Sequence, residues 1–96
     1  MKTLTALEFK EKIKGTLIVQ FSATWCGPCK SLTRTIESIE ADFANPIYRM
    51  DIDEHNELST ALRIRSVPTL IRFEQGEESK RLLGNHPAED LKELTS

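Results

Sequence analysis

Two cysteines set two residues apart give this chain its clearest chemical signature. Cys26 and Cys29 are its only cysteines, and Gly27 and Pro28 lie between them. A dithiol at this spacing can close into a disulfide and open again, so that it exchanges electrons with a disulfide in another molecule. The motif predicts thiol–disulfide exchange, provided that the fold gives the two sulfurs different environments.

A structural disulfide and half of a zinc site are the alternative interpretations of the pair. A structural bridge would close a ring of only four residues. The stabilisation expected for so short a loop, about 2 kcal/mol, is at the low end for disulfides. A zinc site would need further ligands, and the chain offers only His55 and His86 as nitrogen ligands, with no second cysteine pair. We therefore expect no bound metal.

The residues on either side of the pair predict a strand that leads into a helix. Thr16–Phe21 is an apolar, β-branched run of strand length. From Pro28 to Asn45-Pro46 the apolar residues recur at helical spacing, as Leu32, Ile36, Ile39 and Phe43. Cys26 then lies at the N-terminal end of a helix, where free N–H groups and the helix dipole stabilise a thiolate. We expect the pKa of the Cys26 thiol to lie below that of free cysteine, and Cys29 to be less exposed.

The rest of the chain alternates between helix and strand patterns. These patterns predict a first helix from the capping box Thr5/Glu8 to Lys14, a strand at Ile47–Ile52, a short helix with Asp53 as N-cap, a hairpin of Thr69–Phe73 and Lys80–Leu83 around the turn Glu74–Glu77, and a last helix whose first turn holds Pro87. A further strand at Lys2–Leu4 is either short or absent. This order predicts an α/β fold with a mixed sheet, formed by residues 1–96 as one domain.

Composition and charge exclude several classes of function. The net charge is −2, with charged residues making up 29% of the chain and spread along it, so no basic footprint for nucleic acid is present. The longest apolar run near the N-terminus, Leu17-Ile18-Val19, is too short for a signal peptide or a membrane span. We expect a cytoplasmic protein that binds neither nucleic acid nor membrane.

The tract Trp25-Cys26-Gly27-Pro28-Cys29-Lys30 closely resembles the active site of the thioredoxin family. The resemblance extends over nearly the whole chain: Val67-Pro68-Thr69-Leu70 is similar to the cis-proline loop of the family, and Gly84 falls at its late glycine. It implies a thioredoxin fold, with a central mixed sheet of about four or five strands flanked by about four helices.

The resemblance also implies a role for individual residues. Cys26 would be the attacking nucleophile and Cys29 the resolving thiol. Pro68 would be a cis-proline facing the disulfide, and the Val67 backbone would pair with an extended substrate segment. The implied substrate-binding surface consists of Trp25, Gly27, Pro28, Val67, Pro68 and Gly84.

Two buried positions depart from the family pattern. Gln20 stands where thioredoxins usually carry an aspartate that accepts the proton of the resolving thiol, and Arg49 stands where they carry a lysine. A glutamine cannot take a proton near neutral pH. Arg49 stays charged, and it is either offset by Asp51 or a surface cation with its stem packed on the sheet. We expect both positions to affect the pKa values at the site, and release from the mixed disulfide to be slow.

The function implied by the resemblance is that of a dithiol reductase and electron carrier acting on disulfide-containing proteins. An NADPH-linked thioredoxin reductase would regenerate the dithiol, and the protein itself would need no cofactor and act as a monomer. Two alternatives stay open: a thioredoxin-like binding subunit of a larger enzyme, and a disulfide oxidase or isomerase.

Overall fold

The computed structural model describes residues 1–96 of the chain. Its elements are, in order, β1 (Lys2–Thr3), α1 (Ala6–Lys12), β2 (Thr16–Ser22), α2 (Gly27–Ile39), a 3₁₀ turn (Glu40–Asp42), β3 (Ile47–Asp51), α3 (Asn56–Ala61), β4 (Thr69–Glu74), β5 (Glu77–Leu83) and α4 (Ala88–Thr95).

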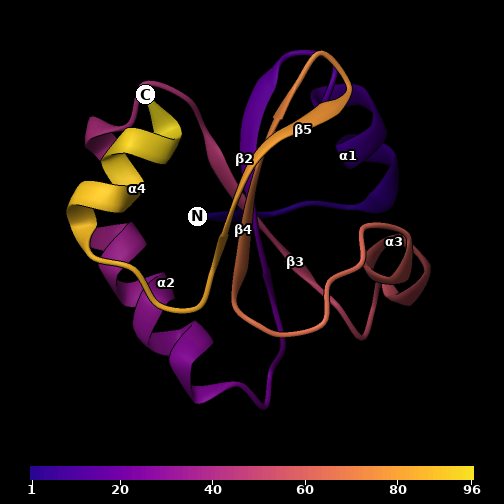
Figure 1. The fold of residues 1–96 in the computed structure, drawn as a ribbon, viewed down its shortest axis with the longest axis horizontal. Coiled ribbons are helices and arrows are strands. Elements are labelled where there is room, and N and C mark those ends of the chain that lie inside the picture. The colour runs from indigo at the N-terminus through magenta and orange to yellow at the C-terminus, as the bar shows by residue number, and fades with distance from the viewer.

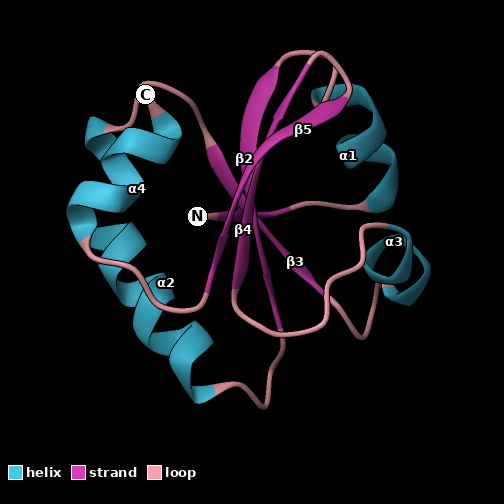
Figure 2. Ribbon diagram, viewed as in Figure 1, coloured by secondary structure: helices cyan, strands magenta, loops and turns pink.

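The strands form one five-stranded sheet in the order β1-β3-β2-β4-β5. β3 runs parallel to both β1 and β2, whereas β4 is antiparallel to β2 and β5 is antiparallel to β4. Figure 2 shows the sheet in the middle of the molecule, with helices on either side. The α/β fold with a mixed sheet that the sequence predicts is confirmed, and β2, which leads into the cysteine pair, is its central strand.

Helices cover both faces of the sheet, with α2 and α4 on one face and α1 and α3 on the other (Figure 1). Alternate residues of β2 supply the two cores, because successive side chains of a strand point to opposite faces. Ile18 packs with Leu32, Ile36, Leu91 and Leu94 of the first pair of helices, and Leu17, Val19 and Phe21 belong to the core on the side of α1. Gln20 therefore shares the face of Ile18 and lies beneath α2.

The first helix begins where its capping box predicts. The hydroxyl of Thr5 accepts a hydrogen bond from the backbone N–H of Glu8, and the carboxylate of Glu8 accepts one from the N–H of Thr5. These bonds to Thr5 hold the pKa of the Glu8 carboxyl below its ordinary value. The helix ends at Lys12, two residues before the predicted end at Lys14.

The prediction that Asp53 caps the third helix is wrong. α3 begins at Asn56 with His55 as its N-cap, and no side chain caps it. The reason is a tight turn before the helix: the carboxylate of Asp51 accepts hydrogen bonds from the N–H groups of Asp53 and Glu54. This turn frees the side chain of Asp53 for another contact, described below.

The remaining boundaries differ by small amounts. α2 ends at Ile39 and a 3₁₀ turn follows, so that the predicted helix is too long by a turn, although Phe43 still packs against the core. The hairpin turn lies where it is predicted, with positive φ at both Gln75 and Gly76, and β5 begins at Glu77 rather than Lys80. Pro87 is the N-cap of α4 rather than part of its first turn.

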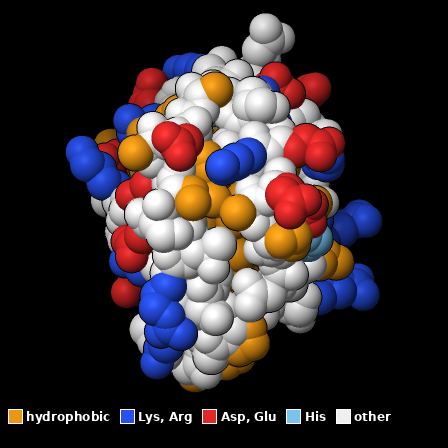
Figure 3. All heavy atoms as spheres, turned by 90° about the vertical axis from the view of Figure 1, so that its left-hand side faces the viewer, with side chains coloured by type: hydrophobic (Ala, Val, Ile, Leu, Met, Phe, Trp, Pro, Cys, Tyr) orange, Lys and Arg blue, Asp and Glu red, His pale blue; other side chains and the backbone are white.

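Figure 3 shows the face of the molecule that α2 and α4 cover, where acidic and basic side chains are interspersed with small apolar areas. None of the helices combines the length and the apolar character needed to cross a membrane.

Candidate active site

The cysteine pair lies just beyond the end of the central strand, at the N-terminus of α2. Cys26 and Cys29 are joined by a disulfide, with their Cα atoms 5.3 Å apart. Cys26 is the N-cap of the helix, and its Sγ accepts a hydrogen bond of 3.1 Å from the backbone N–H of Cys29. Both residues are buried, with 4% and 2% of their surfaces exposed.

This arrangement gives the two sulfurs the different environments that exchange requires. In the reduced protein the Sγ of Cys26 would sit at the positive end of the α2 dipole, where the N–H of Cys29 can stabilise a negative charge. Cys29 lies within the first turn and packs in a small apolar cluster with Ala23, against which Ile52 and Val67 also pack. Gly27 and Pro28 form the exposed start of the helix.

A second segment of the chain faces the outer cysteine. The Val67–Pro68 peptide bond is cis, and the carbonyl oxygen of Val67 lies 3.7 Å from the Sγ of Cys26. Gly84 joins the same site, because its N–H donates a hydrogen bond of 2.9 Å to the carbonyl of Pro68. Gly84 has φ of +79°, a conformation that favours glycine. The structure thus brings two segments that are distant in the sequence together, with Val67 next to Cys26 and Gly84 bonded to Pro68.

Trp25 borders the same surface, with 68% of its side chain exposed. Its indole Nε1 donates a hydrogen bond of 3.0 Å to a carboxylate oxygen of Asp53. Sequence reasoning missed this role for Asp53, since its place after a predicted strand suggested a helix cap instead. Leu83 was also missed; it is 60% exposed and immediately precedes Gly84, and only its position next to that glycine could have pointed to it.

Gln20 is fully buried beneath the site and uses both ends of its amide. Its Nε2 donates a hydrogen bond of 3.2 Å to the backbone carbonyl of Cys29, and its Oε1 accepts one of 3.1 Å from the hydroxyl of Thr33. Gln20 thus ties the first turns of α2 to the central strand. It holds the backbone of Cys29 and not the thiol.

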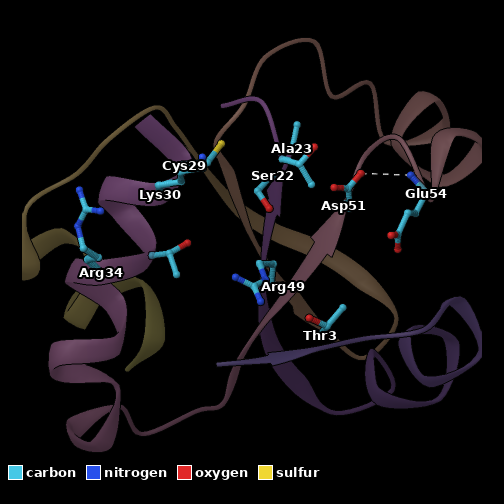
Figure 4. A pocket seen from close by; sticks show the side chains of 11 residues that line it. Thr3, Ser22, Ala23, Cys29, Lys30, Arg34, Arg49, Asp51 and Glu54 are labelled. Atoms are coloured by element: carbon cyan, nitrogen blue, oxygen red, sulfur yellow. Dashed lines mark hydrogen bonds between the residues drawn. The ribbon is translucent and has the colours of Figure 1, made fainter. Parts of the chain in front are cut away.

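Arg49 lies on β3 directly opposite Gln20 of β2. It is half-buried and lines a hollow of about 510 Å³ that also reaches Cys29, Lys30 and Thr33 (Figure 4). No carboxylate forms an ion pair with Arg49, so the suggestion that Asp51 offsets its charge is not supported. The Asp51 carboxylate is instead engaged in the turn before α3.

Comparison with known proteins agrees with this geometry. The thioredoxin family model matches residues 1–96. A thioredoxin from Staphylococcus aureus is 35% identical over an alignment of 94 residues that covers 95% of this chain and 90% of that protein.

Solved structures give the same result. A mutant thioredoxin from Halobacterium salinarum superposes with a TM-score of 0.88 at 28% identity, covering 99% of this chain and 86% of that one. Mitochondrial thioredoxin 3 from Saccharomyces cerevisiae, in its oxidised form, gives a TM-score of 0.85 at 26% identity, covering 98% and 92%. The chain therefore belongs to the thioredoxin family and is a thiol–disulfide oxidoreductase with a redox-active cysteine pair.

Proposed function

We propose that the protein reduces disulfides in other proteins, with Cys26 as the nucleophile and Cys29 as the resolving thiol. The observation that carries this proposal is the position of Cys26 as N-cap of α2, with its Sγ at the N–H of Cys29. The Cys26 thiolate attacks a substrate disulfide, and one substrate sulfur leaves as a thiolate. Cys29 then attacks Cys26, which closes the bridge and releases the second substrate sulfur.

The substrate would dock on the surface around the disulfide formed by Trp25, Gly27, Pro28, Val67, Pro68 and Gly84. An extended segment beside Val67 could pair with its backbone as an added strand does, which suits substrates that differ in sequence. The exposed indole of Trp25 offers apolar contact area at the rim. Its hydrogen bond to Asp53 holds the ring in place.

We propose further that residues 1–96 act as one domain and as a monomer in the cytoplasm, where thiols are kept reduced. There the protein would carry electrons from an NADPH-linked thioredoxin reductase to its substrates, and so contribute to redox homeostasis. The Gly-Pro pair between the cysteines resembles that of reducing thioredoxins, whose potentials lie near about −270 mV. A measured potential in that range would support this direction of electron flow.

Trapping tests the proposed division of labour between the two sulfurs. The Cys29→Ser variant should accumulate mixed disulfides through Cys26, because nothing resolves them, whereas the matched Cys26→Ser variant should accumulate none. Reversed trapping, with Cys26→Ser holding the substrates, would assign the roles the other way round. Full biological activity in the double variant Cys26→Ser, Cys29→Ser would instead favour a binding subunit.

A further inference from the structure

Directly beneath the resolving cysteine the protein carries an amide and no acid–base group. Gln20 holds the buried position beneath Cys29, and its amide is already bonded to the Cys29 carbonyl and to Thr33. An amide does not take a proton near neutral pH. Gln20 therefore cannot take the proton of the Cys29 thiol, which leaves this role to a species that reaches Cys29 from the solvent side.

The hollow beside Cys29 offers such a species a place to enter. Its volume of about 510 Å³ exceeds that of a small oxyanion several times over. Cys29, Thr33 and Arg49 line it, with Lys30 and Arg34 of α2 along the same wall. None of these three cations makes an ion pair or a side-chain hydrogen bond, so all remain available to an anion.

Two carboxylates face the hollow from its other side. Asp51, at the end of β3, is turned toward the backbone N–H of Glu54, which bonds its carboxylate, as Figure 4 shows. Glu54 itself is exposed to solvent. The wall formed by Arg49 and the start of α2 is therefore the cationic side of the hollow, and Cys29 lies on that side.

We propose that this hollow binds a small basic oxyanion, such as hydrogenphosphate, which serves as proton acceptor for Cys29. The anion rests against Arg49 and takes the proton of the Cys29 thiol, directly or through a water molecule. The Cys29 thiolate then attacks the Sγ of Cys26, the bond between Cys26 and the substrate breaks, and the substrate sulfur leaves as a thiolate. The anion carries the proton away as dihydrogenphosphate, so atoms and charge balance.

The proposal rests on the roles proposed above for the two cysteines, and its test isolates the second step. The reduced protein is mixed in a stopped-flow instrument with an aromatic disulfide whose released thiolate absorbs visible light. The first release reports attack by Cys26 and depends on the disulfide concentration. The second release is first order and reports resolution by Cys29. Without a second release the proposed function itself fails, whatever the anion does.

The anion dependence of the second release decides the proposal. At constant pH and ionic strength, phosphate should raise its rate constant about three- to tenfold along a saturating curve, since a loosely held base gives less than a fixed one. Sulfate has a similar charge but accepts no proton near neutral pH, so it should compete with phosphate and give no rise of its own. Equal effects of phosphate and sulfate, or none from either, would overturn the proposal.

A pair of variants locates the effect. Arg49→Met should lose the saturating rise with phosphate, while Lys10→Met, which removes one positive charge from exposed α1, should keep it. Because a half-buried substitution can disturb folding, Arg49→Lys is measured as well and should retain the rise at higher phosphate concentration. An unchanged phosphate curve in a folded Arg49→Met would contradict the proposed site.

Discussion

The Gln20→Asp variant places a carboxylate beneath Cys29. It tests whether a proton acceptor within the protein speeds the attack of Cys29 on the mixed disulfide. Gln20 is fully buried, with its amide bonded to the Cys29 carbonyl and the Thr33 hydroxyl. The new side chain is one methylene shorter, so it would not replace both of these bonds. The matched control is Gln20→Asn, which has the same size and no charge.

The expected gain in rate and loss of stability follow from this burial. Once ionised, the carboxylate should accelerate resolution by Cys29 about tenfold over Gln20→Asn, which is less than a fully positioned base contributes. Burial raises the pKa of an introduced carboxyl and disfavours its ionised form by about 2–3 kcal/mol, with Arg49 limiting the cost. The folded protein then holds a proton that the unfolded chain has lost. Its stability relative to Gln20→Asn should therefore fall as pH rises above about 4.

Two measurements check this reasoning. Urea unfolding from about pH 3 to 9 gives the free energy of unfolding, and stopped-flow release of the second thiolate gives the resolution rate from pH 6 to 9. A rate in Gln20→Asp no higher than in Gln20→Asn across this range would refute the view that resolution lacks a base. Equal stability of the two variants at every pH would refute the view that the position excludes solvent.

Three other predictions concern contacts that do not involve Gln20 or the two cysteines. Asp53→Asn weakens the hydrogen bond that holds Trp25, and the second-order rate with a protein substrate should fall by about two- to fivefold with little change in stability; an unchanged rate would show that the ring needs no anchor. Arg72→Met removes the guanidinium bonds to the carbonyls at the end of α4 and should lower the free energy of unfolding in urea by about 1–3 kcal/mol, whereas a loss within error would make those bonds incidental. The lowered pKa of Glu8 means that its contribution to stability is present above its ordinary value of 4.5 and lost as pH falls further. Glu8→Gln should therefore lose less stability on acidification than the original chain in urea unfolding, and parallel pH curves would contradict this.

Much of the fold could be predicted because local pattern and tertiary packing agree. The run Thr16–Phe21 and the helical stripe after Pro28 each have one period, and a strand and a helix lie at these places, although the helix ends before its predicted stop at Asn45-Pro46. The start of the first helix could be predicted because the capping box at Thr5 fixes it through two local hydrogen bonds. The turn at Gln75-Gly76 was also predicted correctly, and both residues adopt positive φ there.

The predictions that were wrong concern side chains whose hydrogen-bond partners could not be inferred from their own segment of the sequence. Asp53 looks like a helix cap within its own segment, but the indole of Trp25, 28 residues earlier, takes its carboxylate. Asp51 and Arg49 share a face of β3, yet the carboxylate prefers two backbone N–H groups in the adjoining turn. Such competition between partners is settled by three-dimensional distance, which spacing along the chain does not contain.

The position of the Trp25 indole beside the disulfide makes its intrinsic fluorescence a probe of the active site. Trp25 is the single tryptophan of the chain, so all indole emission comes from one ring next to Cys26. Opening the bridge changes the sulfur chemistry beside that ring, and a docked substrate would shield its exposed face from water. Intrinsic fluorescence should thus follow both the redox cycle and complex formation without an attached dye.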